Sequence, residues 1–176
     1  MSEPTVYIII LNYNSASDTI ECIHSLRNLT YQAYSIVLVD NGSSDGSENI
    51  LRKEFPDIQF IQTGSNLGFA GGNNAGIRYA LNRNAGYVWI LNNDTTVHPD
   101  SLSEMIRMTE SDQRIGMTGC KIYFYSEPDT LWYAGGNFDA ANGGITSHNG
   151  WGRKDTGQFD NVTDVDYITG CSLLVK

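Results

Sequence analysis

Runs of apolar residues alternate with polar breaks along the first part of the chain. Uninterrupted apolar runs are typical of strands that a parallel sheet buries on both faces. They occur at 6–11, 36–39 and 87–91, and further strands are expected over 58–61 and 115–124. Apolar residues at helical spacing between these runs predict helices over 16–28, up to Pro56, through 75–81 and from Pro99 to 109. This alternation predicts an α/β fold with a mostly parallel sheet flanked by helices.

Two local signals define where helices should begin. Ser15 and Asp18 have the spacing of a capping box at the start of the first helix. Pro99 suits the first position of the last helix, and Asp100 suits its first turn.

The pattern changes after Ser126, where glycine, asparagine and aromatic residues dominate and the helical period disappears. Short antiparallel strands and long loops are expected there, with a last apolar strand inside 164–176. The tryptophans and tyrosines beyond residue 130 could form a platform for a sugar ring, but packing inside a small lobe is the favoured interpretation from composition.

Composition sets the class of protein. A chain of 176 residues fits one domain with a proper core. The net charge of -9 is not accompanied by a basic stripe, which argues against nucleic-acid binding. Cys22, Cys120 and Cys171 are too few and too scattered for a disulfide framework or a zinc site, so we expect reduced thiols in a cytoplasmic protein. No stretch approaches the length of a membrane span, and no signal peptide is evident.

Polar residues follow three of the predicted strands at their carboxyl ends: Asn12-Tyr13-Asn14, Asp40-Asn41 and Asn92-Asn93-Asp94. In a parallel sheet these ends meet at one edge and can converge on one ligand, for which a nucleotide is the natural candidate. A carboxylate can accept a hydrogen bond from the N3–H of uracil or thymine. Cytosine has an acceptor at N3, so an ionised Asp40 would disfavour cytosine. Asp94 between amides suits Mg²⁺ or Mn²⁺ better than zinc. Taken singly, each segment fits a polar strand exit or an Asx turn as well or better.

The glycine-rich stretch 66–76 lacks the Rossmann spacing and follows the third strand, not the first. It has no Walker lysine, so a P-loop is excluded, and a tight loop feeding a helix is the simpler interpretation. His24, His98 and His148 have no evident partner in the sequence.

Five motifs in order carry a family resemblance: NYN at 12–14, DNGSSDGS at 40–47, NLGFAGGNNAG at 66–76, LNNDT at 91–95 and TGCSLLVK at 169–176. Together the motifs resemble family 2 of the inverting nucleotide-sugar glycosyltransferases, which have the GT-A fold. Within that family the resemblance is greatest to the bacterial rhamnosyltransferase-like branch.

The resemblance implies roles for the matching positions. Asn12, Tyr13, Asn14 and Asp40 would hold the base and ribose of a UDP- or dTDP-sugar. Asn92 to Asp94 replace the family's Asp-x-Asp motif, so Asp94 would bind a divalent metal, Mg²⁺ or Mn²⁺, and Asn92 would lie near the ribose. The nucleotide and donor sugar would be lined by Asn41, Asn66, Gly68, Phe69, Gly71, Asn73, Asn74 and Asn93.

The resemblance also implies a reaction, in which an acidic residue deprotonates an acceptor hydroxyl and a single displacement inverts the anomeric carbon. The family's catalytic base follows the TGCSLLVK-like strand, so it is expected beyond Lys176, and the chain is expected to be truncated. Residues 1–124 would form the donor-binding core, and residues 125–176 would be the start of the acceptor side. A fragment of this kind should bind donor yet transfer sugar poorly.

The expected acceptor is a saccharide or a lipid-linked saccharide in cell-surface polysaccharide synthesis, which would place the protein at the inner face of the cell membrane. Two other functions stay open. A sugar-phosphate nucleotidyltransferase usually carries basic residues after the first strand, which Asn12 to Ser15 do not supply. A non-catalytic nucleotide-binding or interaction module is the third alternative.

Overall fold

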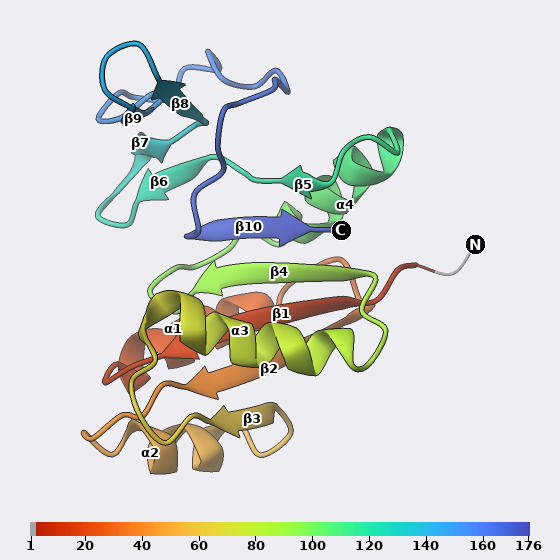
Figure 1. Ribbon diagram of the computed structural model, residues 1–176, viewed down its shortest axis with the longest axis vertical. Helices are drawn as coiled ribbons and strands as arrows, with labels where there is room; N and C mark the ends of the chain where they lie inside the picture. The colour runs from red at the N-terminus through yellow and green to blue at the C-terminus, as the bar shows by residue number, and fades with distance from the viewer. Residues whose placement is uncertain (1–2) are drawn as a thin grey trace.

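The computed structural model describes residues 3–176, and its centre is a six-stranded sheet with the order β3-β2-β1-β4-β10-β5 (Figure 1). Strands β1 to β4 are parallel, whereas β10 runs antiparallel to both β4 and β5. The prediction of a mostly parallel sheet is therefore confirmed. The strands are β1 (Val6–Asn12), β2 (Tyr34–Asp40), β3 (Gln59–Gln62), β4 (Tyr87–Asn92), β5 (Met117–Thr118) and β10 (Ser172–Val175).

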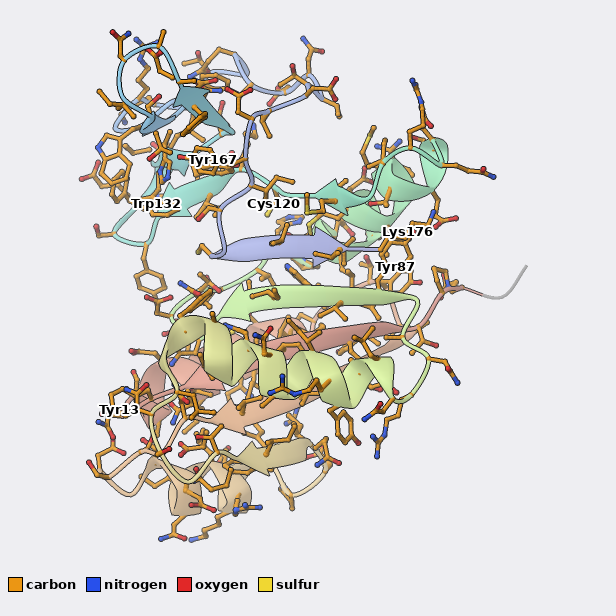
Figure 2. All side chains as sticks on the ribbon, viewed as in Figure 1. Tyr13, Tyr87, Cys120, Trp132, Tyr167 and Lys176 are labelled. Carbon is orange, nitrogen blue, oxygen red and sulfur yellow. The ribbon has the colours of Figure 1, made fainter. Side chains whose placement is uncertain are left out.

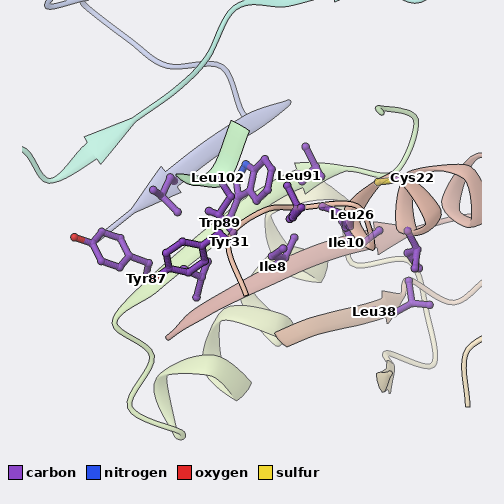
Figure 3. Packing of buried hydrophobic residues seen from close by; sticks show 14 of the residues in the cluster. Ile8, Ile10, Cys22, Leu26, Tyr31, Leu38, Tyr87, Trp89, Leu91 and Leu102 are labelled. Carbon is purple, nitrogen blue, oxygen red and sulfur yellow. The ribbon is translucent and has the colours of Figure 1, made fainter. Parts of the chain in front are cut away.

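Helices cover both faces of this sheet. Helix α3 (Gly68–Leu81) crosses one face, as the front of Figure 1 shows. Helices α1 (Ala16–Leu26), α2 (Ser47–Glu54) and α4 (Ser101–Ser111) contribute Leu26, Leu51 and Leu102 to the apolar cluster on the other face. Trp89 at the centre of β4 is fully buried in this cluster (Figure 3), and its indole N–H donates to Ser172 Oγ at 3.0 Å, which ties β10 to the sheet.

Two glycines let α3 approach the sheet. A Cβ atom on Gly72 would lie 2.4 Å from Leu11 Cδ1, and one on Gly76 would lie 2.5 Å from Ile9 Cγ2. Real Cβ atoms do not come so close to a packed side chain, so these positions require glycine for contact with β1. The glycines of the 66–76 stretch thus serve packing as well as turning.

The second part of the chain adds a small lobe of antiparallel hairpins above β10 in Figure 1, as the composition predicts. It comprises β6 (Ile122–Phe124), β7 (Glu127–Tyr133), β8 (Gly136–Asp139) and β9 (Ile145–His148). His148 packs against Trp132, Tyr133, Trp151 and Tyr167, with ring centroids 4.6–6.1 Å apart. Of these aromatic residues Tyr133 is buried, Trp132, His148 and Tyr167 are half-buried, and Trp151 is 56% exposed. Trp132 and Tyr167 are labelled in Figure 2.

A charged network fastens the 154–160 loop to β6. Lys121 Nζ donates to Asp155 Oδ2 at 2.6 Å and to Asp160 Oδ1 at 2.7 Å, and the Tyr123 hydroxyl also donates to Asp155 Oδ2 at 2.6 Å. These donors lower the pKa of Asp155 to about 2.

The Asp155 network predicts acid sensitivity. An aspartate in the unfolded chain binds its proton near pH ~3.9. The stabilisation from Asp155 is therefore complete above about pH 4 and is lost as the pH falls through the folded pKa of about 2. Urea titrations between pH 5 and 2 should show a shallower loss of stability for Asp155→Asn than for the parent chain. Equal slopes for the two proteins would contradict the role of the network.

One predicted strand is wrong. The segment 115–124 forms two short strands, β5 and β6, which belong to different sheets. The break is at Gly119, where the chain passes so close to Ile168 that a Cβ atom would lie 2.6 Å from Ile168 Cγ2. The last strand also occupies only Ser172–Val175 of the predicted 164–176 segment.

The helix boundaries need three corrections. Helix α1 ends at Leu26, not at residue 28, and Ser15 makes no side-chain cap: its hydroxyl donates to the Asp18 carboxylate instead of binding the helix amides. Helix α4 begins at Ser101, after Pro99 and Asp100. Helix α3 already begins at Gly68, so most of the predicted loop 66–76 is helical.

Among residues 3–176, none of the helices combines the length and the apolar character needed to cross a membrane.

Candidate active site

The three polar strand ends lie together at one edge of the sheet. Register places Asn12 opposite Asp40 and Leu11 opposite Asn92. Since β10 runs the other way, its preceding turn joins the same edge, and the Asn92 amide donates to the Cys171 carbonyl at 2.9 Å. Tyr13, half-exposed at 46%, marks this edge at the left of Figure 2.

Asp40 is the buried centre of a hydrogen-bond network at this edge. Its Oδ2 accepts from Asn12 Nδ2 at 2.7 Å, and its Oδ1 accepts from the Ser43 amide and from Gln62 Nε2, both at 2.9 Å. Asn12 and Asp40 are 0% exposed. Their roles as direct nucleotide contacts therefore stay predictions; what the structure shows is that Asn12 holds Asp40, and Asp40 holds the loop at Ser43.

The network decides the charge of Asp40. Burial alone would raise its pKa, but the hydrogen bonds donated by Ser43, Gln62 and Asn12 outweigh burial and lower the pKa below its ordinary value. The carboxylate is therefore ionised at neutral pH, although it has no exposed surface.

Asn14 shapes the loop above Asp40. Its backbone is in the left-handed region, with φ 51°, which asparagine tolerates better than most residues. The Asn14 amide donates to Ser43 Oγ at 2.9 Å, and its Oδ1 accepts from the Ser44 amide at 2.8 Å. The loops after β1 and β2 are thus joined, and they leave Tyr13 facing solvent.

Asn41 organises the next loop. Its buried side chain donates to Asn66 Oδ1 at 3.0 Å and to the Gly68 carbonyl at 3.2 Å, and it accepts from the Leu67 amide at 3.0 Å. These contacts connect the end of β2 to the start of α3. The predicted binding residues of 66–68 are therefore placed by a residue from a different strand end.

The first turns of α3 hold the remaining predicted residues of the glycine-rich stretch. Phe69 is 53% exposed, and its ring lies next to Gly170, where an added Cβ atom would be 3.3 Å from the ring. Asn73 is buried and donates to the Phe69 carbonyl at 3.0 Å, but within residues 3–176 its Oδ1 has no partner. Gly71 is half-buried beneath Leu67, and Asn74 is exposed on α3.

The end of β4 is fixed by α1. Asn93 Nδ2 donates to Thr19 Oγ1 at 2.9 Å, and Thr19 Oγ1 lies 2.8 Å from Asn12 Oδ1, to which it donates. The Asn92 carbonyl accepts from the Thr95 hydroxyl at 2.7 Å. The turn after β4 is therefore held from both sides, while Asp94 is left exposed.

Asp94 suits a hard cation. It borders a pocket of about 190 Å³ between α1 and the β6–β7 turn, which Asp18, Glu21 and Tyr125 also line. No hydrogen bond or ion pair in the described part of the chain occupies its carboxylate. Residues 3–176 hold no group of three or more histidine, cysteine or acidic side chains arranged for a metal. This donor set fits Mg²⁺ or Mn²⁺, which are usually held by one or two carboxylates together with substrate phosphates and water.

The thiols beside Asp94 are poor metal ligands. Burial raises the pKa of Cys22 and Cys171 to about 12, and the Asp94 charge adds to both shifts. A thiol must be deprotonated to bind zinc or attack a substrate, so both stay inert at neutral pH. This agrees with a site built from oxygen ligands.

Sequence reasoning missed three contributors: Thr19, Gln62 and Tyr125. Each acts through a partner that is distant in sequence, and nothing in their local pattern distinguishes them from ordinary helix, strand and turn residues. Ser43 lies inside the DNGSSDGS motif, so its position was signalled although its role was not.

Comparison with known protein families shows to which family the chain belongs. The model for glycosyl transferase family 2 matches residues 7–176. The chain belongs to this family. The low-salt glycan biosynthesis hexosyltransferase Agl10 of Haloferax volcanii is 37% identical over 105 residues, which are 59% of this chain and 32% of Agl10. Glycosyltransferase GlyG of Streptococcus pneumoniae is 27% identical over 139 residues, which are 76% of this chain and 44% of GlyG. The chain thus spans less than half the length of these relatives.

Solved structures confirm the predicted GT-A fold. The mannosyltransferase PcManGT from Pyrobaculum calidifontis, in complex with GDP-Man and Mn²⁺, superimposes with a TM-score of 0.62 at 23% identity, covering 70% of this chain and 37% of the other. TarS 1–349 of S. aureus in complex with UDP-GlcNAc gives a TM-score of 0.54 at 20% identity, covering 62% and 32%. At this identity the likeness establishes the family 2 chain as a GT-A fold.

Proposed function

We propose that this family 2 chain forms the donor side of an inverting glycosyltransferase, which binds a UDP- or dTDP-sugar with a divalent metal. The observation that carries the proposal is the arrangement of the carboxyl edge: a buried, ionised Asp40 at the end of β2, an exposed Tyr13 after β1, and an exposed Asp94 after β4. The two strand ends flank the end of β1 on the same edge, so one extended ligand could place a base at one of them and a diphosphate at the other. Family membership favours a transferase over the nucleotidyltransferase alternative.

The chain's own residues divide the work of donor binding. Tyr13 offers an exposed aromatic face for the base, and Asn14 with Ser43 fixes the loop around it. Asn41 orders the 66–68 loop beside the ribose and sugar. Asp94 would hold the divalent metal, which supplies positive charge that stabilises the departing diphosphate when bound.

The proposed preference for uracil or thymine depends on Asp40. Its carboxylate is 0% exposed and already accepts from Asn12, Ser43 and Gln62, so direct contact with a base would need this network to rearrange. An ionised carboxylate accepts the N3–H of these bases and repels the unprotonated N3 of cytosine. Guanine also carries N–H donors on its pairing edge, which makes GDP the most demanding competitor. PcManGT was solved with GDP-Man and TarS with UDP-GlcNAc, so both bases occur among proteins of this fold.

Calorimetric titration tests donor binding. UDP or dTDP should bind at least about tenfold more tightly with Mn²⁺ or Mg²⁺ than with a chelator, because Asp94 would hold the metal whose charge offsets that of the diphosphate. Asp94→Asn keeps the shape but removes the charge, and it should abolish that gain. Asp57→Asn, an exposed carboxylate paired with Arg27 away from this edge, is the matched control and should leave the gain intact.

Two results would overturn the proposal. Equal or tighter binding of CDP or GDP would contradict the role of Asp40 in selecting the base. Absence of nucleotide binding under all metal conditions would favour a non-catalytic interaction module.

The remaining parts of the proposal concern the whole enzyme. The rhamnosyltransferase-like branch, the saccharide or lipid-linked acceptor, the role in cell-surface polysaccharide synthesis and the site at the inner face of the membrane stay predictions. The location of the catalytic base beyond Lys176 and the division at residue 124 stay predictions as well.

A further inference from the structure

One chain of hydrogen bonds runs across all four parallel strand ends. Its first half links Asn93 after β4 to Thr19 on α1 and then to Asn12 at the end of β1, at 2.9 and 2.8 Å. Its second half continues from Asn12 to Asp40 at the end of β2 and on to Gln62 at the end of β3, at 2.7 and 2.9 Å. Gln62 Nε2 also donates to Glu48 Oε2 on α2 at 2.6 Å.

Within this series of hydrogen bonds, Thr19 is the residue that joins the Asn93–Asp94 side of the proposed donor site to the Asn12–Asp40 side. It is 0% exposed, and its hydroxyl accepts from Asn93 Nδ2. Its Oγ1 lies 2.8 Å from Asn12 Oδ1 and 2.9 Å from the Ser15 carbonyl, so these two acceptors share its single proton. No other side-chain hydrogen bond in the described part of the chain joins Asn93 to Asn12. The hydroxyl is thus fully used, and no solvent is needed to satisfy it.

We infer that Thr19 is a positioning residue that couples the base pocket at Asn12 and Asp40 to the metal-binding turn at Asn93 and Asp94. Thr19 reaches no ligand itself. It fixes the amide of Asn93, and through it the direction of the turn that presents Asp94. The reference is Asn12, whose Oδ1 accepts from Thr19 and whose Nδ2 donates to Asp40. The inference rests on the proposed function, because it assigns the Asp40 side and the Asp94 side of this hydrogen-bond series to the base and to the diphosphate of one nucleoside diphosphate.

The chemistry makes the coupling specific to a ligand that touches both ends. UDP with metal engages the Asp40 side and Asp94 together, so it gains from a fixed separation between them. Uridine engages only the Asp40 side and has no such requirement. Loss of the Thr19 hydroxyl should therefore weaken binding of metal–UDP and leave uridine binding nearly unchanged.

Thr19→Val tests this, because valine keeps the branched shape and removes the hydroxyl. It should weaken UDP binding with Mg²⁺ by about tenfold, whereas Thr19→Ser, which keeps the hydroxyl, should bind as the parent chain does. Thr109→Val is the matched control: Thr109 is also 0% exposed and bonds to Met105 and Thr118 in another part of the fold. It should lose stability like Thr19→Val without losing affinity.

A double-mutant comparison separates coupling from general damage. In an Asp94→Ala background, Thr19→Val should cost little further UDP affinity, because the end to which Thr19 connects is already lost. A full tenfold loss in that background would show that Thr19 does not act through Asp94, and would overturn the inference. Equal losses for uridine and for UDP would overturn it as well.

A measurement on the unaltered chain covers the case in which Thr19→Val does not fold. Uridine alone should shift the side-chain amide signal of Asn93 in two-dimensional NMR, although uridine does not reach that residue. An unshifted Asn93 signal in the presence of bound uridine would overturn the coupling and leave donor binding intact. Failure of the parent chain to bind UDP would instead refute the proposed function, so the two failures are distinguishable.

Discussion

Asp40→Ala is expected to lower the free energy of unfolding by about 4 kcal/mol, because it removes a buried acceptor that several donors share. The Ser43 amide would lose its partner, and Asn12 and Gln62 would each lose one of theirs. Urea unfolding followed by circular dichroism measures the loss. The variant should also lose the part of the acid sensitivity that arises as the lowered pKa of Asp40 is crossed below about pH 4.

Asp45→Ala is the matched control for this prediction. Asp45 belongs to the same loop but is exposed, and its carboxylate accepts from the Ser47 amide at 3.0 Å. Its removal should have a much smaller effect on stability. Losses of equal size at the two positions would show that the buried network around Asp40 is not what stabilises this edge.

Gly42→Ala is expected to cost about 3 kcal/mol, from two sources. Gly42 has a φ of +75°, a conformation that disfavours a side chain. An added Cβ atom would also lie 2.6 Å from the backbone of Ser65, which cannot rotate away as a flexible side chain can. The loop contacts made by Asn41 next to it would be disturbed, so metal–UDP affinity should fall together with stability.

Gly46→Ala separates strain from collision. Gly46 has a φ of +89°, but nothing lies within 4 Å of an added Cβ atom. It should therefore cost only the conformational strain, about 1 kcal/mol. Thermal and urea unfolding of both variants measures the difference, and an equal loss at the two sites would contradict the close approach of Ser65.

The sheet could be predicted from the sequence because its signals are local. Strands β1, β2 and β4 each contain a continuous apolar run that stops at a polar residue, so the positions of Asn12, Asp40 and Asn92 followed from the pattern. The helices followed from the same periodicity. The predicted helix ends were less accurate, because caps depend on local geometry. The Ser15 hydroxyl donates to Asp18 instead of accepting from a helix amide, and α3 begins at Gly68, where the glycines suggested a loop.

The connections within the site could not be predicted, because they join residues far apart in sequence. Thr19 meets Asn93 across 74 positions, and Asp40 meets Gln62 across 22. The sequence likewise showed no reason for β5 and β6 to separate at Gly119, since the contact responsible is with Ile168. Motif order predicted which residues belong to the site, but only the fold shows that Asn12 and Asp40 are buried.

A crystal structure of the chain with UDP and Mn²⁺, with anomalous data for manganese, tests the central claim most directly. We expect a manganese peak in direct contact with the Asp94 carboxylate and the diphosphate, and the uracil beside Tyr13 at the carboxyl edge of the sheet. The molecule offers an alternative location, a cavity of about 660 Å³ beside the amino half of β2, lined by Tyr34, Tyr79 and Arg83 among others. UDP bound in that cavity, or manganese bound away from Asp94, would contradict the account.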